Sequence, residues 1–131
     1  MSDKTSFEKR VQGDVHAEIV LDENENPVTL PGKKFNHYKV RLYLETQNPE
    51  VQSVTYRLDP TYYDPVREST DVDGKFNVEL TTYGDYPVTV DAQIGGEIVR
   101  KVVPLFKLLQ EEYGASSSPE IKSALEEIKA H

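Results

Sequence analysis

The stretch "YPVTVDAQIGGEIVRKVV", residues 86–103, decides the fold class of this chain. Its first half alternates apolar and polar residues, which is the period of a β-strand with one buried face. The residues on the apolar face are Tyr86, Val88, Val90, Ala92 and Ile94. Gly95 and Gly96 then supply a two-residue turn that tolerates positive φ, and the strand "EIVRKVV" returns. The stretch therefore predicts an antiparallel hairpin.

The same alternation recurs in the segments before this hairpin. The residues predicted to face the core are Val15, Ala17, Ile19 and Leu21, then Tyr38, Val40, Leu42 and Leu44, then Val54, Tyr56 and Leu58, and then Phe76, Val78 and Leu80. The segment "DPVREST" predicts one more short strand, and residues 22–34 predict a loop by their Asn, Pro and Gly content. Six or seven antiparallel strands at close spacing indicate an all-β fold, a two-sheet sandwich.

The two ends of the chain follow other patterns. Residues 1–13 are polar without sustained periodicity, so we expect a flexible N-terminal segment before a sandwich domain at residues 14–103. Residues 104–131 change to helical spacing and predict a short α-helical C-terminal extension of two helices. The residues that indicate the helices are Leu105, Leu108 and Leu109 for the first, and Ser118 as N-cap, Pro119, Ile121, Leu125 and Ile128 for the second. Whether these helices pack on the sandwich or contact a partner stays open.

Composition excludes several classes of function. The 131 residues suit one domain, and the net charge of −8 argues against a sequence-independent grip on nucleic acid, which needs Lys and Arg on phosphates. Too few basic residues adjoin one another for a polybasic membrane patch. No apolar run approaches the ~20 residues that cross a bilayer, and the charged N-terminus lacks the apolar core of a signal peptide. We expect a soluble, acidic, cytoplasmic protein without nucleic-acid or membrane partners.

The sequence offers little for catalysis or metal binding. The absence of cysteine excludes thiolate nucleophiles and Cys-ligated zinc, and it fits a reducing compartment. His16, His37 and His131 are scattered, and no nucleophile elbow, phosphate loop or zinc motif is present. The segment "DENENP" only partly matches a calcium loop, since Pro27 stands where glycine is needed, so it predicts a hairpin turn. We therefore predict no enzyme activity, no metal and no cofactor.

Two tyrosine-rich loops are the feature that composition does not explain. "LDPTYYDP", residues 58–65, follows one predicted strand, and "TTYGDYP", residues 81–87, follows another. Turn formation requires the Pro and Asp residues but not the tyrosines. Strand connectivity alone does not place the two loops at the same end of a sandwich.

These loops and the segments between them resemble the YEATS domain, in its prokaryotic branch. The matching elements, in order and spacing, are Leu58-Asp59-Pro60-Thr61-Tyr62, Asp64-Pro65-Val66-Arg67, Lys75-Phe76 and Thr82-Tyr83-Gly84-Asp85-Tyr86. The resemblance covers roughly residues 51–94. It implies an immunoglobulin-like β-sandwich in which a flat acyl amide enters an aromatic cage, between two rings at one end of the sandwich.

The resemblance assigns a role to each matching position. Tyr62 and Tyr83 match the two aromatic walls, and Thr61 matches the hydroxyl that hydrogen-bonds the amide. The backbone around Tyr83 and Gly84 matches the part that receives the acyl carbonyl, and Tyr86 matches an aromatic residue that closes the site.

This chain also departs from the family pattern at two of these positions. Asp59 stands where the family has histidine, and Thr82 where it has glycine. A carboxylate at position 59 either suits a cationic ligand or means that acyl-lysine reading has been lost.

Three functions remain open from the sequence. The first is a non-enzymatic binding module, a sensor or adaptor in signalling, that takes a planar or acylated ligand. The second is a protein-interaction adaptor that uses a sheet edge or the C-terminal helices, and the third is an enzyme with an unrecognised carboxylate site. Alternatively, Tyr62 and Tyr83 pack in the core, because such sandwiches carry a buried corner tyrosine, a role that Tyr56, Tyr62 or Tyr86 could each fill. Tyr63 is predicted to point away from Tyr62 and to serve as packing. The sequence names neither the partner, a protein or a small acylated ligand, nor the oligomeric state.

Overall fold

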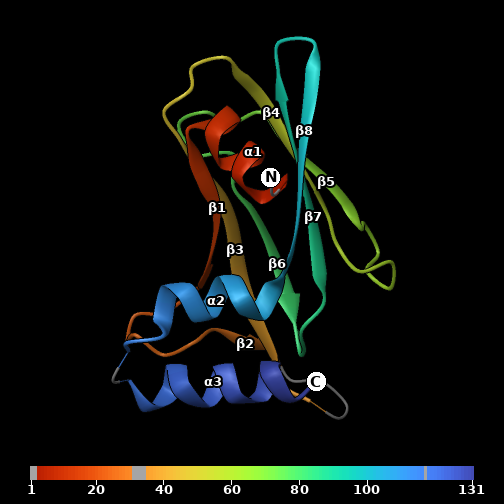
Figure 1. The fold of residues 1–131 in the computed structure, drawn as a ribbon. Coiled ribbons are helices and arrows are strands. Elements are labelled where there is room, and N and C mark those ends of the chain that lie inside the picture. The colour runs from red at the N-terminus through yellow and green to blue at the C-terminus, as the bar shows by residue number, and fades with distance from the viewer. Residues whose placement is uncertain (1–2, 31–34, 117) are drawn as a thin grey trace.

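The computed structural model describes residues 3–30, 35–116 and 118–131. The elements, in chain order, are α1 Asp3–Val11, β1 Gly13–Ile19, β2 Thr29–Leu30, β3 His37–Thr46, β4 Val51–Arg57, β5 Val66–Ser69, β6 Val78–Thr82, β7 Pro87–Ile94, β8 Glu97–Pro104, α2 Leu105–Tyr113 and α3 Pro119–Ala130. In one antiparallel sheet β1, β2 and β6 all pair with β3, and the other sheet has the order β5-β4-β7-β8 (Figure 1). The predicted two-sheet β-sandwich is confirmed.

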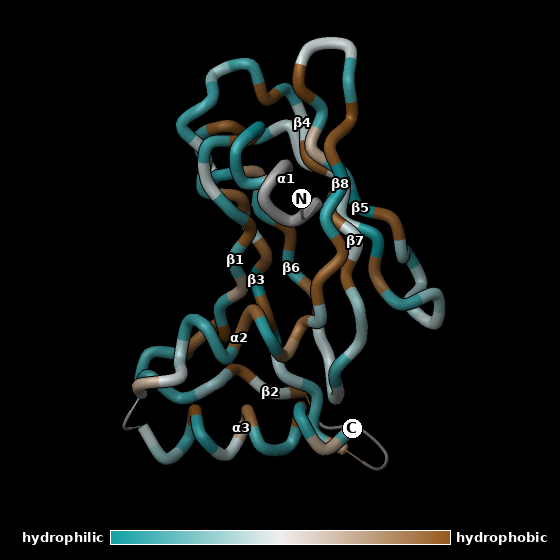
Figure 2. The backbone as a smooth tube through the Cα atoms, in the orientation of Figure 1, coloured by the Kyte–Doolittle hydropathy of each residue, from teal (hydrophilic) through white to brown (hydrophobic). Residues whose placement is uncertain are grey.

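The apolar faces of the two sheets form the core, as the alternation predicts. Hydrophobic and hydrophilic residues alternate along the longer strands (Figure 2), and the hairpin turns at Gly95, whose φ is +60°. Two predicted core residues behave differently. Leu21 lies beyond the end of β1 and is 38% exposed, so its predicted place in the core is wrong. Phe76 is buried, but it lies in the turn before β6 with a φ of +54° rather than in a strand.

Tyr56 is the buried corner tyrosine of this sandwich. Its side chain is fully buried, and its hydroxyl donates to the Phe76 carbonyl at 2.8 Å. Burial raises the pKa of the Tyr56 phenol, which stays protonated as a donor. Tyr56 thus fills the fully buried packing role, whereas Tyr62 and Tyr86 are partly buried and pack against the core from outside it.

The N-terminal segment contains a helix that the sequence analysis missed. Residues 3–11 form α1, with Phe7 and Val11 fully buried, so the prediction of a flexible segment is wrong there. The Lys101 ammonium on β8 lies 2.8 Å from carboxylate oxygens of both Glu8 and Asp14. Since these residues belong to α1 and to β1, the ammonium joins the helix to both sheets. A signal was present in the i, i+4 spacing of Phe7 and Val11.

The C-terminal helices pack on the sandwich, which answers the question the sequence left open. Helix α2 lies across one end of the sandwich, and α3 lies against α2 (Figure 1). Helix α2 buries Leu105, Leu108 and Leu109, and α3 buries Ile121, Ala124 and Ile128. The predicted N-cap is confirmed, because Ser118 Oγ accepts from the Ile121 amide at 3.3 Å.

Candidate functional site

All six residues that the sequence analysis assigned to a ligand site line one pocket. Asp59, Thr61, Tyr62, Tyr83, Gly84 and Tyr86 belong to a pocket of about 470 Å³. The two tyrosine-rich loops meet there because β4 and β7 are antiparallel neighbours, with Arg57 paired to Thr89. The loop that follows β4 therefore lies beside the loop that precedes β7.

Asp59 organises the loop after β4. Its Oδ1 atom accepts the Thr61 amide at 3.0 Å and the Thr61 hydroxyl at 2.7 Å, which is a common way for Asp to close a turn. These hydrogen bonds, first from the Thr61 backbone and then from its side chain, lower the pKa of Asp59. Because the hydroxyl proton of Thr61 is donated to Asp59, the Thr61 oxygen can only accept a hydrogen bond from a ligand.

Tyr62 and Tyr86 form a linked pair at the pocket wall. The Tyr62 hydroxyl donates to the Thr81 carbonyl at 2.6 Å and accepts from the Tyr86 hydroxyl at 3.1 Å. The two ring centroids are 5.7 Å apart with an interplanar angle of 60°, an edge-to-face contact. The guanidinium carbon of Arg67 lies 5.8 Å from the centre of the Tyr62 ring. Burial raises the pKa of both tyrosines, so both phenols are neutral donors. The Tyr62 ring is therefore held from several sides.

Thr82 organises the loop between β6 and β7. Its side chain is 3% exposed, and its hydroxyl donates to the Gly84 carbonyl at 2.6 Å and accepts the Gly84 amide at 3.1 Å. A threonine at this position thus closes the loop with its own side chain. The Gly84 amide is already bonded and is not a donor for a ligand carbonyl.

Tyr83 projects from this loop with 47% of its surface exposed. Its ring is stacked on Phe35, with centroids 5.3 Å apart and an interplanar angle of 10°, and it lies at the same centroid distance from His37. On the far side of the loop, the Asp85 carboxylate accepts the Phe106 amide at 2.9 Å and so holds the loop to the start of α2.

Sequence reasoning missed several residues around the pocket. His37, Thr81, Thr82, Asp85 and His131 also line it. Tyr63 lines it too and is 98% exposed, so its predicted role as packing is wrong. The position of His37 at the start of a strand was a weak signal. No local signal pointed to His131, since α3 brings it to the pocket from the far end of the sequence.

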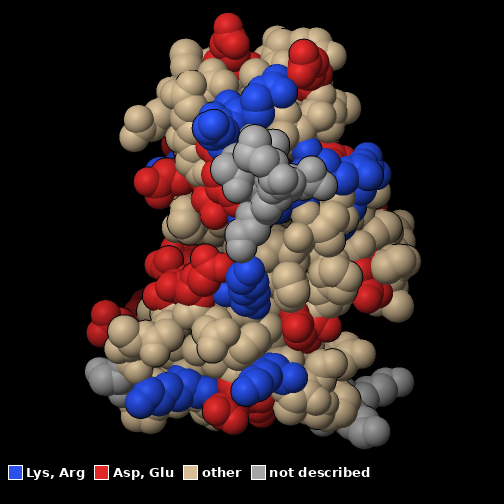
Figure 3. All heavy atoms as spheres, in the orientation of Figure 1, with Lys and Arg blue, Asp and Glu red and all other residues tan. Residues whose placement is uncertain are grey.

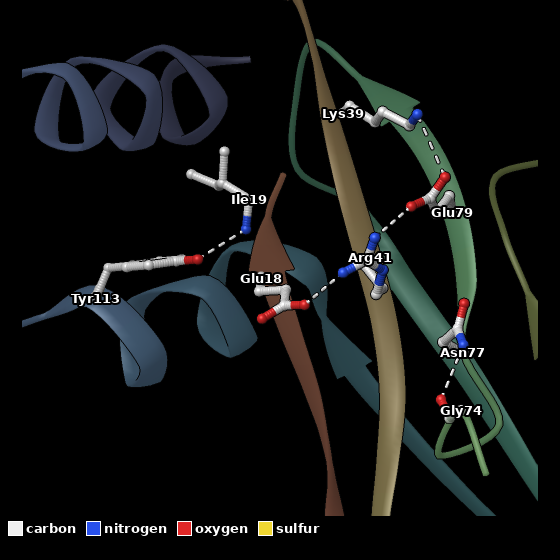
Figure 4. Close-up of polar contacts among 8 residues, drawn as sticks. All are labelled: Glu18, Ile19, Lys39, Arg41, Gly74, Asn77, Glu79 and Tyr113. Carbon is white, nitrogen blue, oxygen red and sulfur yellow. Dashed lines mark hydrogen bonds and ion pairs between the residues drawn. The ribbon is translucent and has the colours of Figure 1, made fainter. Parts of the chain in front are cut away.

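A second, more polar depression of about 360 Å³ lies on the outer face of the β1-β3-β6 sheet, and Glu18 and Arg41 are among the residues that line it. Arg41 lies between two carboxylates, 3.0 Å from Glu18 and 2.7 Å from Glu79, and Lys39 is 3.3 Å from Glu79 (Figure 4). The hydrogen bond from Arg41 lowers the pKa of Glu79. These charges compensate one another, which is typical of a structural surface network.

The described part of the chain shows no further chemistry of the kinds considered above. Among residues 3–30, 35–116 and 118–131, no three His, Asp or Glu side chains are placed to hold a metal ion. The "DENENP" segment is the predicted turn, because Asp22 Oδ1 accepts the amides of Asn24 and Asn26. None of the described helices is long and apolar enough to cross a bilayer. On the face seen in Figure 3, Lys and Arg side chains lie among Asp and Glu.

Known proteins share this fold. The crystal structure of the Yaf9 YEATS domain bound to H3K27ac is 12% identical, covers 71% of this chain and 68% of its own, and has a TM-score of 0.50. The crystal structure of the yeast AF-9 homolog protein Yaf9 is 16% identical and covers 71% and 66%, also with a TM-score of 0.50. Such identities establish the fold alone, an immunoglobulin-like sandwich. No curated protein matches the sequence.

The family model of the prokaryotic YEATS domain matches residues 38–102, which include both tyrosine-rich loops. Over residues 38–102 the chain is therefore similar to the prokaryotic YEATS domain family.

Proposed function

We propose that this domain is a non-enzymatic binding module that takes a planar or acylated group, such as an acyl-lysine side chain, in the pocket between its two tyrosine-rich loops. The observation that carries the proposal is the convergence of Asp59, Thr61, Tyr62, Tyr83, Gly84 and Tyr86 on one pocket. The family match and the likeness to a YEATS domain solved with H3K27ac support it. In this proposal the module serves a signalling protein as a sensor or adaptor.

The hydrogen bonds of the pocket suit an amide. An acyl-lysine amide presents one N–H donor and one carbonyl acceptor, and the Thr61 oxygen is available to accept the N–H because its own proton goes to Asp59. The Gly84 amide is bonded to Thr82, so we assign the ligand carbonyl to the backbone N–H of Tyr83. The faces of Tyr62 and Tyr83 then supply stacking and dispersion to the flat amide.

The charges at the pocket favour some acyl groups over others. Its lining residues include the two carboxylates Asp59 and Asp85, in a chain with a net charge of −8. Like charges repel across a partly desolvated pocket, so we expect neutral acetyl- and crotonyl-lysine to bind more tightly than anionic succinyl-lysine. Asp59 thus makes the site selective for charge without removing the amide geometry.

An amide NMR titration tests this function. Peptides carrying unmodified, acetylated, crotonylated or succinylated lysine are added to the intact domain. We expect saturable shifts at Thr61, Tyr62, Tyr83 and Gly84 with the two neutral acyl groups. Tyr83→Ala should abolish these shifts, whereas Tyr43→Ala, on the outer face of the β1-β3-β6 sheet, should leave them unchanged. A panel without saturable shifts at the pocket would refute binding of acyl-lysine.

A protein-interaction adaptor is the second candidate, favoured by one surface feature. Ile98 and Val102 are exposed on β8, which is the edge strand of its sheet. Exposed apolar residues at an edge strand suit pairing with another chain. We expect Ile98→Ser with Val102→Ser to abolish any self-association seen by sedimentation at high concentration, and a wild-type chain that stays monomeric would count against pairing between copies.

A further inference from the structure

The end of helix α3 lies against the loop that carries Tyr83. A Cβ atom placed on Gly84 would lie 2.6 Å from the main-chain carbonyl carbon of His131 and 3.0 Å from its oxygen. The centroid of the His131 ring is 3.9 Å from that of Phe35, the residue that stacks on Tyr83. His131 thus contacts both the backbone of the loop and the aromatic stack beside it, and it lines the pocket.

The packing of α3 on α2 sets the position of His131. Helix α3 is capped by Ser118 and buries Ile121, Ala124 and Ile128 against α2. Helix α2 is in turn held to the sandwich, where the Tyr113 hydroxyl accepts the Ile19 amide at 2.9 Å (Figure 4). Because a packed helix moves only at the cost of its buried contacts, the end of α3 presents a fixed surface to the pocket.

We propose that the end of α3 is a wall of the binding pocket that limits the length of the group bound there. The wall lies outside residues 38–102, so the segment that defines the family does not supply it. A group short enough to stop at His131 binds without disturbing the helix, whereas a longer group must displace it. This inference rests on the proposed function for the nature of the ligand, but the wall itself can be tested without one.

The ligand-free test uses two glycine variants. Gly84→Ala places a methyl group within contact distance of His131, so we expect it to shift the amide resonances of residues 128–131 and to speed hydrogen exchange in α3. Gly96→Ala is the matched control, since a Cβ there meets no atom within 4 Å. If Gly84→Ala leaves the α3 amides as they are in Gly96→Ala, α3 is not a wall of the pocket.

The ligand test uses lysine peptides with acetyl, butyryl and hexanoyl groups. In His131→Ala we expect affinity for the longer groups to rise relative to acetyl by about fourfold per additional buried methylene. Ser123→Ala, on the exposed face of α3, should keep the wild-type order of affinities. Equal length preference in wild type and His131→Ala overturns the inference. If wild type binds none of the series, the proposed function fails, and the Gly84→Ala result alone decides whether α3 walls the pocket.

Discussion

Thr82→Val tests whether one buried hydroxyl holds the loop that carries Tyr83. Valine keeps the β-branched shape of threonine and suits the end of strand β6. It removes the hydroxyl that bonds both the carbonyl and the amide of Gly84, at 2.6 and 3.1 Å. Thr82 and Gly84 are both buried, so water does not readily replace the lost partner.

The size of the effect follows from these two bonds. A net contribution of about 1 kcal/mol per hydrogen bond gives a loss of about 2 kcal/mol, and the cost of leaving buried groups unpaired raises it towards 3 kcal/mol. We therefore expect the free energy of unfolding to fall by about 2–3 kcal/mol. Ligand affinity should fall as well, because a loosened loop must be ordered before it can bind.

Urea unfolding followed by circular dichroism measures the stability of the variant, and hydrogen exchange at the Gly84 amide reports the loop directly. Thr89→Val is the matched control: it is a half-buried threonine on β7 outside the residues that line the pocket. If the unfolding free energies of Thr82→Val and Thr89→Val differ by less than about 0.5 kcal/mol, the Thr82 hydroxyl does not hold the loop in place.

Two further predictions concern the scaffold. Asp91 is buried and accepts hydrogen bonds from Arg57 and Arg100, so Asp91→Ala should cost about 2 kcal/mol at neutral pH. Burial alone would raise the pKa of Asp91, but the hydrogen bonds from Arg100 and Arg57 outweigh it and lower that pKa. The stabilisation by Asp91 is therefore present above the pKa of an unfolded aspartate and is lost as pH falls through the lower pKa of the folded state. Urea titrations should show that the difference in unfolding free energy between Asp91→Ala and wild type becomes smaller in acid. A difference that does not change with pH would contradict this prediction. Phe7→Ala should lower the free energy of unfolding by about 3–5 kcal/mol, because it empties a buried site under α1. Lys9→Ala, at an exposed position of the same helix, should leave the free energy of unfolding almost unchanged. Equal urea midpoints for the two variants would contradict the packing of α1.

The sandwich was predictable because its strands carry a strict alternation with one buried face. Val40 and Leu42, like Val88 and Val90, lie in the core where the pattern places them. Leu21 departs from the pattern because β1 ends at Ile19. Where a strand ends depends on its pairing with neighbouring strands, which the local sequence does not specify.

The convergence of six residues on one pocket was predictable from the family resemblance, but the residues around them were not. Phe35, which precedes β3, stacks on Tyr83. His131, which follows α3, lies beside Gly84 because α3 packs on α2. Such contacts depend on tertiary structure, and one sequence carries no local trace of them. Helix α1 was missed for a related reason: only two apolar residues, Phe7 and Val11, mark its buried face.

Helix α2 is fastened at its two ends to different parts of the domain. At its start, the Leu105 amide donates to the Tyr86 carbonyl and the Phe106 amide to Asp85, both in the pocket loop. At its end, the Tyr113 hydroxyl holds Ile19, where β1 finishes at the edge of the opposite sheet. Helix α2 thus links the pocket loop to the edge strand β1. A displacement of the pocket loop would therefore move the start of α2 and would load the Tyr113–Ile19 hydrogen bond at its other end.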